Sequence, residues 1–210
     1  PGHFWMPLLE GAHVSTDCAV VEGAIAWCRH ATGLAWHEGT FRYWTIHAAA
    51  EPALEQSLSI WVARHMAGYT GMMNFETIGG TIIEAHLRFA DQWCDLYGEG
   101  WVEALVRLYA EGIWDFADTS RRDGCSMPLF ARHGAAFRHP PPSLQAEVRA
   151  MPGVRSLQVT FHEGRLPEDH AMPPGGFRLA VINAEGPDAA RAARLRLATA
   201  WDPSLLLSQD

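Results

Sequence analysis

The chain has 210 residues, of which 48% are hydrophobic and 19% are charged, so it can form one core or two small ones. Its formal net charge is −8 and all sixteen basic residues are arginine, which leaves no basic stripe of the kind that binds nucleic acid. No apolar run approaches the ~20 residues that a membrane span needs. Neither nucleic acid nor a membrane is therefore expected as a partner.

The first part of the chain predicts a β-hairpin followed by a helix. Residues 8–21 alternate between apolar and polar, residues 24–30 read as a return strand, and Glu22-Gly23 supplies the turn. Residues 51–70 show apolar side chains at three- and four-residue spacing, which is typical of an amphipathic helix. Proline at position 52 is tolerated in a first helical turn.

A second hairpin is predicted over residues 71–89, because an apolar alternating run and a β-branched run flank two glycines. Side chains alternate across a strand, so residues two apart share a face. The polar side chains that share a face are Glu84, His86 and Arg88 on the return strand, and Asn74 and Glu76 on the first strand.

The turn decides whether these two polar sets meet. A three-residue loop, Ile78-Gly79-Gly80, places Asn74 opposite Glu84 and unites the polar faces. A two-residue Gly79-Gly80 turn places Asn74 opposite Ala85 and separates them. We favour the three-residue loop, since a polar face opposite an apolar one makes the more consistent sheet.

Two carboxylates, an amide, an imidazole and a guanidinium on one face suit hard-cation and phosphate chemistry. Magnesium binds through one or two carboxylates and leaves positions for substrate phosphates, and an arginine can meet developing negative charge. The alternative is a solvated hairpin face with surface charges, which the alternation predicts equally well.

The run Glu84-Ala85-His86-Leu87-Arg88, preceded by a strand ending Met73-Asn74-Phe75, resembles the Glu-x-Asn-x-Arg signature of the ATP-grasp ligases. The resemblance implies a nucleotide site that uses Glu76, Ile83 and Glu84. It also implies a Mg²⁺ site made of Glu84, Asn74 and His86, and it makes Arg88 the catalytic residue that assists at an acyl phosphate.

Two positions depart from that pattern. His86 stands where asparagine is usual, and Asn74 stands where an acid is usual. Glu76, on the same face as Asn74, is the expected replacement for the lost carboxylate.

The first hairpin extends the resemblance. Glu10-Gly11-x-His13-x-Ser15-x-Asp17 resembles the segment that opens the second half of the nucleotide cleft in ATP-grasp ligases, with His13 near the place of a usual Glu. A plain hairpin with one polar face is the alternative interpretation.

The remainder of the chain predicts alternating helices and short strands. We expect helices over 91–98, 101–111, 143–150 and 189–201, and strands over 125–131, 134–138, 154–163 and 175–184. Gly175-Gly176-Phe177-Arg178-Leu179-Ala180 resembles a strand of the small domain that closes many ATP-grasp ligases. The expected fold class is α+β, an antiparallel sheet with helices on one face plus a small α+β closing domain. The predicted division gives 1–115 as the C-terminal half of an ATP-grasp domain and 116–210 as the closing domain.

Two further features allow other readings. His162-Glu163 and Glu168-Asp169-His170 suggest a zinc site, although eleven histidines make chance proximity easy and the loop equally suits a mobile flap. Cys18, Cys28, Cys94 and Cys125 are widely spaced, which fits core positions in a reducing cytoplasm better than metal binding or disulfides.

The resemblance implies an ATP- and Mg²⁺-dependent ligase that joins a small-molecule carboxylate to an amine or thiol through an acyl phosphate. The chain starts at Pro1 and has no lysine to reach phosphates, so we expect it to be a C-terminal part of such an enzyme, inactive alone and able to pair as a homodimer. The alternative is a degenerate, non-catalytic ATP-grasp-like module used for binding or assembly.

Overall fold

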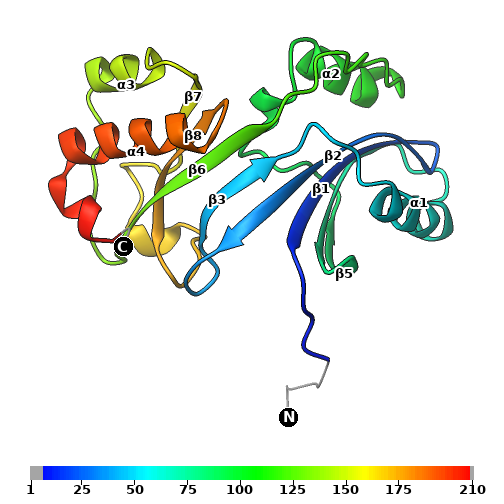
Figure 1. Ribbon diagram of the computed structural model, residues 1–210, viewed down its shortest axis with the longest axis horizontal. Helices are drawn as coiled ribbons and strands as arrows, with labels where there is room; N and C mark the ends of the chain where they lie inside the picture. The colour runs from blue at the N-terminus through cyan, green and yellow to red at the C-terminus, as the bar shows by residue number, and fades with distance from the viewer. Residues whose placement is uncertain (1–6, 209–210) are drawn as a thin grey trace.

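The computed structural model describes residues 7–208. The expectation of a missing upstream half rests in part on the first six residues, which lie outside that range. Figure 1 shows one extended, twisted sheet with helices packed along it. The strands are β1 His13–Val21, β2 Ala24–Ala35, β3 Phe41–Ile46, β4 Gly71–Ile78, β5 Thr81–His86, β6 Gly124–Ala131, β7 Val154–Val159 and β8 Phe177–Ala184, and the α-helices are α1 Pro52–His65, α2 Trp101–Glu111, α3 Pro142–Arg149 and α4 Pro187–Trp201.

The sheet has eight strands in the order β5-β4-β1-β2-β3-β6-β8-β7, and all neighbouring pairs are antiparallel. This confirms the predicted α+β class with an antiparallel sheet. The sheet runs without a break across the predicted division at 115/116, because β3 pairs with β6. That ladder has three paired positions, whereas every other ladder of the sheet has at least five. The division into two domains stays a prediction.

Helices α1 and α2 cover opposite faces of the first five strands. Leu58 and Val62 of α1 pack with Phe75 on one face. Trp101 and Leu108 of α2 pack on the other face in a cluster rich in aromatic side chains. Burial of these apolar surfaces is the main force that holds the helices to the sheet.

Helix α4 lies on the same face as α1, as the register of β3 and β6 shows. Trp44 belongs to the cluster that packs with α2, and Ser126 of β6 pairs directly with it. The neighbouring Cys125 and Met127 therefore point to the other face, where they pack with Ala190 of α4. The face that carries α2 is covered beside β8 by the 92–95 segment, which is hydrogen-bonded to Asn183.

The turn between β4 and β5 differs from the favoured prediction. The expected three-residue loop, with Asn74 opposite Glu84, is wrong. Gly79 and Gly80 alone form the turn, with φ angles of 56° and 83° that glycine adopts without strain. Asn74 pairs instead with His86.

A β-bulge nevertheless unites the two polar faces. Thr77 pairs with Ile82, but the next residue of β4, Glu76, pairs with Glu84, so Ile83 is the extra residue of β5. The register shifts by one at this point, and a shift of one residue exchanges the faces of a strand. The polar set of β5 thus lies on the same face as the polar set of β4, as predicted, but through a bulge rather than through the turn.

A second bulge redirects a cation at the other end of the sheet. Leu129 pairs with Ala180, whereas the next residue of β6, Phe130, pairs with Arg178, which leaves Leu179 as the extra residue of β8. Arg178 therefore shares a face with Phe130, on the side of the sheet that carries α2 rather than on the side of α4.

Two elements expected from the sequence do not form. The predicted helix over 91–98 contains only a short 3-10 segment, Cys94–Leu96, and no strand forms over 134–138. The 90–96 segment is fixed instead by side chains of the C-terminal strands: Asn183 donates to the Gln92 carbonyl at 2.7 Å and to Asp95 at 2.6 Å, and Gln158 donates to the Gln92 carbonyl at 3.0 Å. Within residues 7–208, every helix is too short or too polar to cross a bilayer.

Candidate functional site

The candidate site lies on the face of the sheet opposite α1, where three neighbouring strands present polar side chains. In the register of β1 and β4, Ser15 pairs with Glu76 and Asp17 pairs with Asn74. In the register of β4 and β5, those same two β4 residues pair with acidic and imidazole side chains. Directly paired residues point to the same face, so the polar set extends over Ser15, Asp17, Asn74, Glu76, Glu84 and His86.

Three of these side chains converge closely enough to share one cation. Single ligand atoms of Glu76, Glu84 and His86 all lie within 4.8 Å of one another. His86 Nε2 is 3.1 Å from Glu84 Oε1, and the Glu84 side chain is 54% exposed. The structure therefore brings together three of the residues that the sequence singled out, with lone pairs open to solvent.

His13 supports this cluster from β1. Its Nε2 lies 2.9 Å from Glu76 Oε2, and its ring packs edge-on against Phe41 and Trp44. This hydrogen bond holds the pKa of Glu76 below its usual value against the opposing effect of burial, and the charges of His86 and Arg88 act in the same direction. Glu76 therefore stays ionised at neutral pH despite its partial burial.

Asn74 lies apart from the open cluster. It is 2% exposed, and its Nδ2 donates to Ser15 Oγ at 2.8 Å and to Asp17 Oδ1 at 2.7 Å. The amide nitrogen is thus used in a buried network, and its role as a metal ligand stays a prediction.

Asp17 is the centre of that network, and we did not choose it as a site residue from the sequence. It accepts from the Tyr97 hydroxyl at 2.6 Å and from the Ala90 backbone N–H at 2.9 Å, in addition to Asn74. Burial raises the pKa of Asp17 to about 6, although these hydrogen bonds and the charge of Arg88 oppose the rise. Its place in the segment that starts at Glu10 was the only sequence signal for it.

The other two predicted residues lie at the margin of the cluster. Arg88 is exposed and donates to the Phe89 carbonyl at 3.2 Å, while its charge lowers the pKa values of Asp17 and Glu76. Ile83 is the bulged residue of β5 and is 40% exposed. The catalytic role of Arg88 and the nucleotide contact of Ile83 stay predictions.

A cavity of about 190 Å³ adjoins Glu76 and extends toward the C-terminal strands. Its walls are mainly apolar and aromatic, with Glu76 on one side and Arg178 on the other. The Nε of Arg178 is buried and has no hydrogen-bond partner among the described residues, and burial lowers the pKa of this guanidinium against the charge of Asp91. Arg178 lines the cavity, and the positive charge of its guanidinium favours an anionic group there. The cavity is lined by Gly39, Phe41, Trp44, Glu76, Gln92, Pro128, Phe130, Pro173 and Arg178.

The suggested zinc site in the loop after β7 has a different arrangement. The His162 backbone N–H donates to His170 Nε2 at 3.0 Å, and the two rings stack with centroids 6.3 Å apart. In the described part of the chain, two groups of side chains are close enough to share a metal ion, and neither includes these histidines. The contacts between His162 and His170 instead stabilise the conformation of the loop.

Comparison with known proteins identifies the fold. No protein-family model matches the sequence, and no curated protein matches it. Among solved structures, the chain is similar to the phosphoribosylaminoimidazole carboxylase ATPase subunit from Aquifex aeolicus, with a TM-score of 0.59 and 14% identity over 94% of this chain and 57% of that one.

Two further structures give the same result. The L-amino acid ligase from Bacillus licheniformis matches with a TM-score of 0.58 and 12% identity over 92% of this chain and 54% of that one. The carboxyaminoimidazole ribonucleotide synthase from Aspergillus clavatus, complexed with ATP, matches with a TM-score of 0.55 and 12% identity over 95% of this chain and 50% of that one. The chain thus spans about half the length of these structures. It shares the fold of these structures, which confirms the resemblance at the level of fold.

Proposed function

We propose that this chain forms one wall of the active site of an ATP-dependent ligase that joins a small-molecule carboxylate to an amine or thiol. The observation that carries the proposal is the convergence of Glu76, Glu84 and His86 on one face of the sheet, beside a cavity that contains Arg178. Similar folds that are ligases or were solved with ATP support the reaction class.

The donor set of the cluster fits a divalent cation. Two carboxylates satisfy the preference of Mg²⁺ for oxygen ligands, and the open side leaves room for the waters that Mg²⁺ retains. The imidazole of His86 also suits Mn²⁺, which accepts nitrogen more readily than Mg²⁺ does. Glu76, Glu84 and His86 would hold the ion, with Asn74 behind them, and the ion would neutralise the phosphate charge of bound ATP.

His13 and the buried Asp17 network have a positioning role in this proposal. His13 fixes one oxygen of Glu76 at 2.9 Å and leaves the other free to bind a cation. Asp17 fixes Asn74 and, through the Ala90 backbone N–H, the chain that follows Arg88. Ligands held by hydrogen bonds from behind lose less conformational entropy when the ion binds.

The two arginines divide the anionic groups between them. Arg178, which lines the cavity, would bind the carboxylate of the substrate. Arg88, exposed at the end of β5, would stabilise the charge that develops at the phosphoryl group. ATP would transfer its γ-phosphoryl group to the substrate carboxylate and leave as ADP, and the amine or thiol would then attack the acyl phosphate and displace inorganic phosphate.

The size of the cavity agrees with a chain that provides only part of the binding site. Pockets for small molecules are ~300–1,000 Å³, whereas this one is about 190 Å³. A facing surface is therefore needed to enclose ATP, including contacts to its base against Ile83. The four cysteines are free, which fits the reducing cytoplasm that we propose as the location.

The experiment that tests the proposal measures Mn²⁺ binding by the electron paramagnetic resonance signal of the free ion. We expect Glu84→Gln to weaken binding at least tenfold, because it removes one anionic ligand from a three-ligand cluster. Glu103→Gln, on an exposed position of α2, is the matched control and should leave binding unchanged. Equal affinities in both variants would contradict the metal site.

A further inference from the structure

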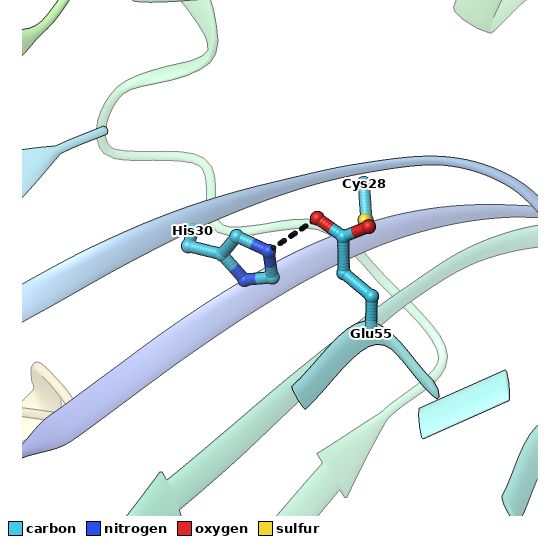
Figure 2. Close-up of side chains that lie close together, drawn as sticks. All are labelled: Cys28, His30 and Glu55. Atoms are coloured by element: carbon cyan, nitrogen blue, oxygen red, sulfur yellow. Dashed lines mark hydrogen bonds and ion pairs between the residues drawn. The ribbon is translucent and has the colours of Figure 1, made fainter. Parts of the chain in front are cut away.

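A second cluster of ligand-type side chains lies on the other face of the sheet, between β2 and α1. Ligand atoms of Cys28, His30 and Glu55 all lie within 4.8 Å of one another. Figure 2 shows the Glu55 carboxylate between the cysteine sulfur and the imidazole, with His30 Nε2 at 3.0 Å from Glu55 Oε1. Nothing in the proposed ligase chemistry uses these residues.

We propose that Cys28, His30 and Glu55 form a site for a single Zn²⁺ ion. Ligand atoms within 4.8 Å of one another can converge on one tetrahedral zinc ion, in which bond lengths of about 2.0–2.3 Å place neighbouring ligands ~3.3–3.7 Å apart. Thiolate, imidazole and carboxylate are the three ligand types that zinc uses in proteins.

The charges of the ligands suit a buried position. The side chain of His30 is fully buried and Cys28 is 8% exposed, so an ion with uncompensated charge would be strongly disfavoured here. A thiolate and a carboxylate together carry two negative charges, which match those of Zn²⁺. When the ion binds, the proton of the Cys28 thiol passes to solvent, and the site becomes neutral overall.

The residues behind the ligands fix their orientation. His30 Nδ1 lies 2.9 Å from the hydroxyl of Thr16, which is fully buried and pairs directly with His30 in the sheet. In the metal-free state His30 Nε2 donates to Glu55 and Nδ1 accepts from Thr16. A hydroxyl can also accept, so the imidazole can carry its proton on Nδ1 and offer Nε2 to the metal.

Glu55 connects the site to solvent. Its side chain is 30% exposed, and the Glu51 backbone N–H donates to its Oε1 at 3.2 Å, which steadies the first turn of α1. The exposed side leaves a fourth coordination position for water. The ion would tie the start of α1 to the middle of β2, two elements that already meet through apolar packing and the hydrogen bond between His30 and Glu55.

The test titrates Co²⁺ into the metal-free full chain and follows the near-ultraviolet absorption band of a cobalt–thiolate bond. We expect one Co²⁺ per chain with this band, competition by Zn²⁺, and no band in Cys28→Ser. Glu55→Gln, which keeps the side-chain volume, should weaken binding at least tenfold. Cys94→Ser and Glu84→Gln are the matched controls and should retain the band.

Circular dichroism establishes that each variant is folded before the titration is interpreted. Folded wild-type chain that shows no thiolate band at saturating Co²⁺ would overturn the proposal, as would a band that survives in Cys28→Ser or disappears in Cys94→Ser. An independent readout is the melting temperature, which Zn²⁺ should raise more in wild type than in Glu55→Gln, where only the Glu76, Glu84 and His86 cluster remains intact. A rise of equal size in both would also overturn the proposal.

Discussion

The two clusters contain similar side chains but occupy opposite environments on the same sheet. Glu76, Glu84 and His86 lie at the edge hairpin, where the Glu84 side chain is 54% exposed. Cys28 and His30 lie on a central strand under α1, and the His30 side chain is fully buried. Both sets place a carboxylate within 3.1 Å of an imidazole nitrogen.

The difference shows that burial decides what such a pair does for the protein. Burial keeps His30 neutral by lowering its pKa, against the hydrogen bond and charge of Glu55. For Glu55, burial acts to raise the pKa, but hydrogen bonds from His30 and the Glu51 N–H outweigh it and lower the pKa. The inner pair, His30 and Glu55, therefore stabilises the fold even without a metal. The outer pair, Glu84 and His86, is more exposed, so a change in its contacts costs little free energy.

The first prediction separates the two clusters by stability. Glu55→Ala should lower the free energy of unfolding by about 1–3 kcal/mol, because it leaves the buried His30 donor without an acceptor. Glu84→Ala should change it by less than about 0.5 kcal/mol, as is usual for exposed positions. Urea denaturation of both variants in the presence of a chelator measures the difference. Equal losses of unfolding free energy would show that burial does not distinguish the two clusters.

The second prediction concerns Asp17, which is buried like the inner cluster but belongs to the outer face. Its pKa is raised from 3.8 to about 6 in the folded state, so the folded protein binds this proton more tightly than the unfolded chain does. The proton stabilises the fold below pH 3.8, and this contribution is lost as the pH rises through about 6.

Asp17→Asn cannot take up that proton. The free energy of unfolding of wild type, relative to that of Asp17→Asn, should therefore rise by about 2 kcal/mol as the pH falls from ~7 to ~4. Denaturant titrations at several pH values measure the change. A difference that is constant with pH would show that Asp17 ionises normally despite its burial.

The third prediction tests whether the outer cluster depends on the pairing of Glu76 with Glu84 or on the bulge itself. Deletion of Ile83 should remove the bulge and keep Glu84 opposite Glu76, because Glu84 would then directly follow Ile82, the partner of Thr77. Mn²⁺ affinity should therefore stay within about threefold of wild type, a change of less than about 0.7 kcal/mol. Ile83→Val retains the bulge and is the matched control. A tenfold loss after the deletion but not in Ile83→Val would show that the geometry of the bulge itself is needed to bind the cation.

The sequence predicted most of the fold because its signals are local. The hairpin turns at Glu22-Gly23 and Gly79-Gly80, the amphipathic pattern of α1 and the alternation of β8 depend on neighbours in the chain. The 91–98 segment was mispredicted because long-range hydrogen bonds from Asn183 and Gln158 determine its path.

The site was predictable only in part, for a related physical reason. Glu76, Glu84 and His86 follow from alternation and resemblance, but the bulge that brings them together has no residue signature at Ile83. Arg178 enters the cavity through a second bulge at Leu179, and Cys28 meets Glu55 only when α1 folds back onto β2. These are tertiary juxtapositions, and residue periodicity carries no information about them.

The short ladder between β3 and β6 has a consequence for ligand choice. Glu76 lies on one side of this ladder and Arg178 on the other, so the width of the gap between the two charges depends on the three pairs that join the strands. Small changes in the twist at this ladder would alter which molecule can contact both Glu76 and Arg178. Selection by size would then reside in backbone geometry, at strand positions away from the two charged groups.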